Sequence, residues 1–209
     1  WVAQPIVGHD VMYHLALVSW SSSSFLQAIL IASLVTPLAL VFRSLAKQAN
    51  RKRRKDETIL WALPLAFLVL GSLAVFFPIF MGNGQVLAQA LLSSQPIPYL
   101  PLTLAVKGLL VYLLLRNGAY GGTLTPSFAL GIGSGYFVTL LLTVVGIHLD
   151  PALGMLLGAT VFLGTTLQAP LTAIALSLGF TGQDWGLTIP LVLAAGMSYV
   201  IRKRWEKKQ

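Results

Sequence analysis

The chain has 209 residues, of which 56% are hydrophobic and only 10% are charged, and its mean hydropathy is +0.80. That composition lies outside the range of ordinary soluble domains and places the chain in a lipid bilayer. Fourteen basic and six acidic residues give a formal net charge of +8. Twelve of the basic residues fall into two clusters, residues 43–55 and 202–208, that flank apolar segments. Such clusters mark the cytoplasmic side of a membrane protein, with lipid headgroups or nucleic acid as less favoured partners.

The start of the sequence gives no sign of a targeting segment. The chain contains no cysteine, so no disulfide framework is expected and the compartment cannot be read from redox chemistry. It begins with Trp1, and no basic leader precedes a short apolar core, so no signal peptide is expected. We expect a single membrane domain over residues 1–209 that is a piece of a longer protein, in a prokaryotic inner membrane, with both basic clusters cytoplasmic.

Long and short apolar segments alternate along the chain. Residues 1–24 are semi-polar and end in a serine run that is typical of a helix cap. Four later segments are close to the ~20 residues that span the hydrocarbon: 25–42, 59–80, 127–149 and 151–167. Two others, 86–92 and 171–180, are too short to cross upright. This mixture of long and broken spans is typical of transporters.

Proline and glycine predict the breaks between these segments. Pro64 and Pro78 are expected to kink the helix over 59–80, and residues 81–84 form a tight turn into a short helix. Residues 95–101 form a break before a helix over 102–115. Later breaks are expected at residues 168–170 and 179–185, before a last helix over 187–201.

The glycine-rich turn Asn117-Gly-Ala-Tyr-Gly-Gly-Thr-Leu-Thr-Pro126 separates two apolar segments. Gly121 and Gly122 let the backbone approach a ligand closely, and proline in the first turn of a helix loses no useful N–H. The N–H groups of Thr123, Leu124 and Thr125 would then point ahead of the helix, with the positive end of its dipole behind them. The turn is therefore either a buried anion site or a helix break that eases packing.

Two basic residues lie outside the clusters. Lys107 sits inside an apolar run, where a charge is expensive, and we expect it to act on the pathway, with snorkelling toward an interface as the alternative. Arg116 adjoins the glycine turn and could draw anions toward it. Its alternative role, as a solvated charge that complements the end of a helix, is somewhat favoured.

The remaining polar residues do not suggest catalysis. We find no metal-ligand spacing, no Ser/His/Asp arrangement and no paired carboxylates, and we expect neither an enzyme nor a cofactor. His9, His14 and His148 are interpreted as structural or interfacial. The pairs Gly131/Gly135 and Gly154/Gly158 have the spacing that lets membrane helices pack closely.

At this point the pattern resembles the C-terminal half of the CLC family of chloride channels and proton–chloride antiporters. Gly118-Ala-Tyr-Gly-Gly-Thr-Leu-Thr-Pro126 is similar to that family's GxFxP anion-site segment. The stretch from Leu167 to Thr181 is similar to its second motif, an R-A-P-L-T-like break followed by a helix. Met81-Gly-Asn-Gly84 and Lys107 also stand where the family has a glycine-rich turn and often a basic residue.

The resemblance implies an all-α integral membrane fold of two inverted repeats with broken and re-entrant helices, of which this chain supplies mainly the second. It implies a homodimer with one anion pathway in each subunit. The N–H groups of Thr123 and Leu124 would bind chloride or a similar anion, with Thr125 nearby. Protons could be coupled to this transport. Residues 171–178 and 187–197 would lie near the dimer interface.

The chain departs from the family pattern in several places. Leu124 replaces the usual phenylalanine, where the expected contribution is from the backbone, and Gly179 stands where a glutamate is frequent. The GSGIP and GxEGP segments and the helix with the central tyrosine are absent from these residues, and Tyr199 lies too early to take that role. A non-transporting membrane scaffold, in which the glycine turns only aid packing, is the alternative function.

Overall fold

The computed structural model describes residues 11–18, 21 and 23–207. Within that part of the chain all regular structure is helical, and no strand occurs. The elements are α2 (Ser23–Arg51), α3 (Ile59–Phe76), η1 (Pro78–Phe80), α4 (Gln85–Leu92), α5 (Leu100–Arg116), α6 (Leu124–Val144), α7 (Pro151–Leu167), α8 (Pro170–Thr181), η2 (Trp185–Leu187) and α9 (Thr188–Glu206). The expectations for residues 1–10, which include His9, and for Trp20, Ser22 and Lys208 lie outside the described residues.

Among the described residues, four segments are long and apolar enough to cross a membrane: α2, α3, α6 and residues Trp185–Glu206. The helices α7 and α8 are shorter, with 17 and 12 residues. The predicted span over 151–167 is thus a helix with those bounds, but shorter than a full span. The predicted break over residues 179–185 is confirmed, but it begins later than predicted, because α8 continues through Gly179 to Thr181 and turns at Gly182, whose φ is +62°.

The centre of the molecule is the pair α6 and α7. Both helices are mostly buried, and small residues on each let their backbones touch. A Cβ added at Gly131 would lie 2.7 Å from the carbonyl oxygen of Gly158, and one at Gly158 would lie 2.6 Å from Cα of Gly135. The predicted packing role of these glycines is confirmed.

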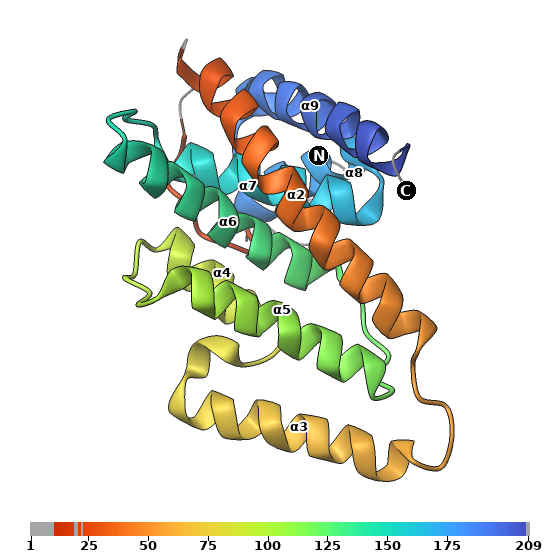
Figure 1. The fold of residues 1–209 in the computed structure, drawn as a ribbon. Helices are drawn as coiled ribbons and strands as arrows, with labels where there is room; N and C mark the ends of the chain where they lie inside the picture. Colours follow the sequence, from red (N-terminus) through yellow and green to blue (C-terminus); the bar gives the residue numbers. More distant parts are fainter. Residues whose placement is uncertain (1–10, 19–20, 22, 208–209) are drawn as a thin grey trace, which may run out of the picture.

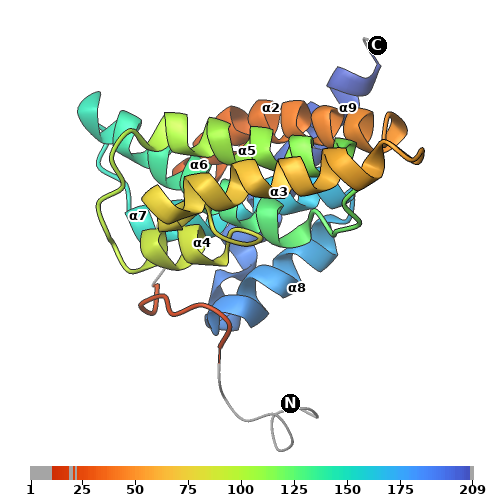
Figure 2. The ribbon, with the colours of Figure 1, turned by 90° about the horizontal axis from the view of Figure 1, so that it is seen from below.

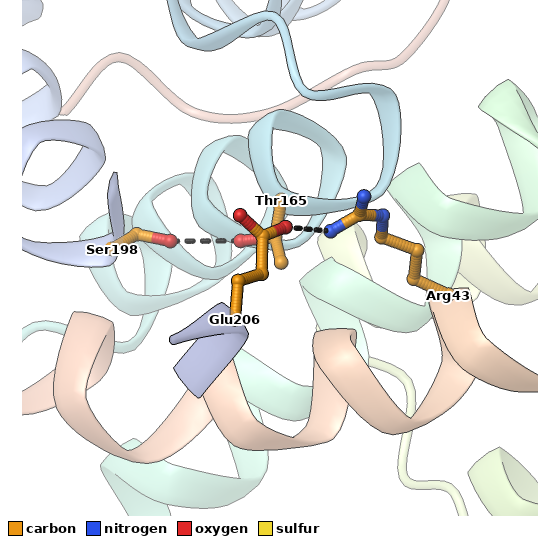
Figure 3. Close-up of polar contacts among 4 residues, drawn as sticks. All are labelled: Arg43, Thr165, Ser198 and Glu206. Carbon is orange, nitrogen blue, oxygen red and sulfur yellow. Dashed lines mark hydrogen bonds and ion pairs between the residues drawn. The ribbon is translucent and has the colours of Figure 1, made fainter. Parts of the chain in front are cut away.

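The helices α2 and α9 lie side by side on one side of this pair (Figure 1). Figure 3 shows two polar contacts there: the hydroxyls of Thr165 and Ser198 are 2.8 Å apart, and Arg43 donates to Glu206 over 2.8 Å. The first contact joins α7 to α9 and the second joins α2 to α9. The C-terminal helix is therefore held by hydrogen bonds as well as by apolar packing.

The opposite side is formed by α4, α5 and, outermost, α3 (Figures 1 and 2). In α3 only Ala66 is buried, and large apolar side chains such as Trp61 and Leu68 are exposed. Pro64 lies inside α3, whereas Pro78 begins the short helix η1. The α3 helix contacts α5 and η1, so it forms a separate outer layer.

Candidate anion-binding site

The glycine turn begins where α5 ends. Asn117 caps the helix by donating its backbone N–H to Leu113, and Gly118 follows with φ +111°. A Cβ at Gly118 would lie 2.5 Å from Cγ1 of Ile59, so both the backbone angle and the space require glycine there. The backbone N–H of Arg54 also donates to the carbonyl of Arg116 over 3.0 Å, which fixes this end of α5 to the loop before α3.

The helix α6 starts three residues earlier than the apolar segment at 127 that the sequence predicted. Thr123 is its N-cap residue, and the first intrahelical bond runs from the N–H of Ser127 to the carbonyl of Thr123, over 2.9 Å. The Thr123 side chain makes no capping hydrogen bond. Within the described residues, the N–H groups of Thr123, Leu124 and Thr125 therefore find no acceptor, which is the state that an anion can satisfy.

Gly121 and Gly122 precede these N–H groups and are both exposed. Neither has a positive φ, and a Cβ added at either would meet nothing within 4 Å. The described part of the fold therefore does not require glycine at these two positions. This openness contrasts with Gly118 in the same turn and leaves room in front of the α6 N-terminus.

Lys107 of α5 is only 1% exposed, so the alternative that it snorkels to an interface is wrong. Its Nζ donates to the carbonyl oxygens of Phe80 and Gly82, each over 2.8 Å. An ammonium group has three donors, so these two bonds leave one N–H for a further acceptor. Lys107 thus carries a buried charge and also holds the turn between η1 and α4.

Gly84 brings Lys107 and α6 together. It is the N-cap residue of α4, with φ +104°. A Cβ there would lie 2.9 Å from Cβ of Ala129, 3.7 Å from Cε of Lys107 and 3.8 Å from Cα of Pro126. The N-terminus of α4, the first turns of α6 and the buried ammonium group therefore meet in one region, and all three contribute positive potential.

Arg116 is exposed at the last turn of α5, and its Nη1 donates to the hydroxyl of Tyr112 over 3.0 Å. This placement fits the helix-end role better than a direct role at the anion site. Sequence reasoning passed over Ser127, whose Oγ is buried and has no hydrogen-bond partner. A serine directly after proline in an apolar run was the available signal.

The other candidate residues are dispersed. His148 is exposed in the loop before α7, and His14 is exposed with its backbone N–H bonded to Gln89. Asp150 caps α7 by accepting from the N–H of Ala152, over 2.9 Å. Among the described residues no three His, Cys, Asp or Glu side chains lie close enough to hold a metal.

Comparison with known proteins assigns the family. The model of the voltage-gated chloride channel family matches residues 1–203. The chain belongs to this family. The ClC-type chloride channel ClcB proteins of Salmonella dublin and Salmonella typhi are each 30% identical over 148 residues, which cover 68% of this chain and 36% of the relative. A crystal structure of a CLC-type fluoride/proton antiporter has a TM-score of 0.75 and 22% identity over 97% of this chain.

The match is to part of each relative. The chain spans about a third of the length of the curated ClcB relatives and half of the antiporter chain. It is an all-helical membrane protein with the CLC fold, as the sequence resemblance implied, and it comes from a family of channels and transporters.

Proposed function

We propose that the protein to which this chain contributes moves chloride or a similar small anion across a membrane, as a channel or as a proton-coupled antiporter. The backbone N–H groups of Thr123 and Leu124, with Thr125 nearby, form part of the anion site, and Gly121 and Gly122 let the ion approach. The observation that carries this proposal is the set of N–H groups without acceptors at the N-terminus of α6, behind an open glycine turn.

Partial charges suit conduction. Backbone dipoles replace part of the hydration shell of the ion, yet they release it more readily than a direct ion pair would. Lys107 raises the local potential while its ammonium group stays bonded to two carbonyls. Lys107 therefore supplies a positive charge near the pathway, and its hydrogen bonds to the turn before α4 hold it in place.

The family and the ClcB relatives support anion transport as the activity. The related crystal structure is that of a fluoride/proton antiporter, and it supports the antiporter form as one of the two mechanisms. We propose further that the protein acts as a homodimer in a bacterial inner membrane. Its basic loops at 43–55 and 202–208 would face the cytoplasm.

The test is anion efflux from liposomes that contain the full-length protein, with external pH recorded at the same time. Chloride or fluoride flux with stoichiometric proton counterflow establishes an antiporter, and flux without it establishes a channel. Folded protein that carries no anion would contradict the proposal. It would favour the scaffold alternative, in which the glycine turn serves only packing.

A further inference from the structure

A groove of about 470 Å³ separates α3 from α5, away from the proposed anion site. From α3 it is lined by residues that recur every three or four positions and therefore lie on one face of the helix: Thr58, Trp61, Ala62, Leu65, Ala66 and Val69. Leu113 of α5 lies across from them. Most of these side chains are apolar, so the groove is suited to a hydrocarbon chain rather than to a polar ligand.

The mouth of the groove is polar. Arg54 and Asn117 line it beside Thr58. The backbone bond from Arg54 to Arg116 places this arginine at the end of α5, so the mouth is built into the fold. The groove thus has a charged end and an apolar body, as an amphiphilic ligand requires.

The charge at the mouth is positive and available. Residues 51–55 are all basic, and the acidic pair Asp56 and Glu57 follows them, so the loop is net positive. Arg54 and Lys55 are exposed, and within the described residues the ion pair that the structure contains, Arg43 with Glu206, involves neither of them. Arg53 is already engaged, because its guanidinium lies 4.4 Å from the centre of the Tyr120 ring. Arg54 lines the groove and Lys55 follows it in the chain, so these two exposed groups are the ones placed to bind a phosphate at the mouth.

The length of the groove fits one leaflet. From Thr58 to Val69 the helix advances by roughly 16 Å at 1.5 Å per residue. Half of a hydrocarbon core that is about 30 Å thick is about 15 Å. An acyl chain whose headgroup lies at Arg54 would thus reach from the membrane surface to the midplane along this groove.

We propose that the groove between α3 and α5 binds an anionic phospholipid, with its phosphate at Arg54 and Lys55 and one acyl chain along Trp61, Leu65 and Val69. Anionic lipids are enriched in the cytoplasmic leaflet of a membrane. Basic loops face the cytoplasm, which is the orientation proposed for residues 43–55. Because α3 is otherwise an exposed outer layer, the bound lipid would fasten it to α5. This site is independent of anion transport at α6.

The experiment measures lipid binding by native mass spectrometry, on the full-length protein stripped of lipid in a neutral detergent. Phosphatidylglycerol and phosphatidylcholine with identical acyl chains are compared, with glycerol phosphate as a headgroup without chains. We expect retention of phosphatidylglycerol, little retention of phosphatidylcholine and none of glycerol phosphate. Equal retention of the two lipids, or retention of glycerol phosphate, would overturn the proposal.

Two variants locate the site. The double variant Arg54→Gln with Lys55→Gln should weaken phosphatidylglycerol binding by about thirtyfold, because each basic residue near the surface contributes roughly fivefold. The matched control is Lys203→Gln with Arg204→Gln, two exposed residues of the other basic cluster, which should leave binding unchanged. Equal losses in the two double variants would mean that only general surface charge is involved, and would overturn the site.

The groove is tested by filling it. Ala62→Trp places a bulky side chain among the lining residues and should abolish retention of the lipid, whereas Leu60→Trp, at an exposed position of α3 outside the lining, should not. The thermal unfolding midpoint without lipid shows whether each variant folds. Normal lipid retention by folded Ala62→Trp would show that the chain lies elsewhere or that another part of the full-length protein occupies the groove, and it would contradict the proposal.

Discussion

Gly135 of α6 and Gly122 of the turn before it lie in opposite surroundings. A Cβ at Gly135 would collide with the carbonyl oxygen of Gly154 and would lie 2.9 Å from Cα of Gly158, whereas one at Gly122 would meet nothing within 4 Å. The first glycine is required by the contact between two helices. The second is not required by any contact in the described chain, and under the proposed function it would give an anion access to the backbone N–H groups beyond it.

The difference separates two tasks within one helix. The body of α6, from Pro126 onward, is buried against α7 and α4, while Thr123, Leu124 and Thr125 before it are only half-buried. A rigid helix with a partly accessible N-terminus holds its N–H groups in a fixed direction, which is what a preorganised anion site needs. Substitutions that change one of the two regions at a time can therefore separate the two tasks.

The largest effect on stability is expected from Gly135→Ala. The atoms that the new methyl group meets are backbone atoms of α7, which cannot move aside, so we expect a loss of about 1–3 kcal/mol in the free energy of unfolding. The measurement is the thermal midpoint of the full-length protein in detergent. The matched control is Gly71→Ala in the outer helix α3, where nothing lies within 4 Å and where alanine should be neutral or stabilising.

Lys107 is expected to affect both the affinity for the anion and the stability of the fold. Lys107→Met removes the charge and leaves the carbonyls of Phe80 and Gly82 without their donor, so we expect anion affinity to fall on the order of tenfold. Lys107→Arg keeps the charge and should weaken binding less. Calorimetric titration with the anion measures both affinities, and equal values for the two variants would count against a role for the charge.

The variant Lys107→Gln separates the charge of the lysine from its hydrogen bonds to the carbonyls. Its amide group can still donate to a carbonyl, but it carries no charge. Lys107→Gln should therefore unfold at a higher temperature than Lys107→Met while binding the anion equally weakly. If Lys107→Gln instead bound as tightly as the parent protein, the lysine would serve only to hold the turn.

Gly122→Ala should leave the fold intact, because nothing lies within 4 Å of the added methyl group. If the anion approaches the N–H groups past this residue, the methyl group should weaken anion binding by roughly fivefold, or about 1 kcal/mol. The thermal midpoint and the calorimetric affinity are measured on the same sample. A fall in the midpoint with unchanged affinity would return this glycine to the packing role and remove the contrast with Gly135.

The smallest effect on stability is expected from the exposed ion pair between Arg43 and Glu206. Glu206→Gln removes the ion pair with Arg43, and the glutamate side chain is 44% exposed. Exposed ion pairs contribute at most about 1 kcal/mol, so the thermal midpoint should change little and less at high salt. A loss comparable to that of Gly135→Ala would show that the link between α2 and α9 matters more than its exposure suggests.

The sequence predicted those parts of the fold that depend on local chemistry. The long apolar segments, the break at Gln168-Ala-Pro170 and the close packing of Gly131 and Gly135 follow from composition, proline and spacing. The continuation of α8 through Gly179 did not follow, because a single glycine lowers helix propensity without ending a helix. The exposure of α3 could not be predicted either, because its sequence is apolar on every face and does not show which face packs against a neighbour.

The candidate site was predictable in part. Proline at 126 indicated the helix start, but the N-cap at Thr123 depends on where the first hydrogen bond forms. The burial of Lys107 and its two carbonyl partners, which are about 25 residues away in the chain, depends on tertiary packing that no local pattern encodes. The position of Ser127 after proline was readable in the sequence, but the burial of its unpartnered hydroxyl also depends on tertiary packing.

The most direct test of the central claim is Thr123→Pro compared with Thr123→Ala, by calorimetric anion binding to the full-length protein. The φ of Thr123, −89°, lies roughly 10° beyond the range of proline, the preceding residue is glycine, and the side chain makes no cap bond, so a small backbone adjustment suffices and the exchange deletes mainly one N–H. We predict that proline weakens binding about tenfold to a hundredfold, the range of one hydrogen bond to a charged group, and that alanine leaves it unchanged. Equal affinities for the two folded variants would contradict backbone coordination of the anion at α6.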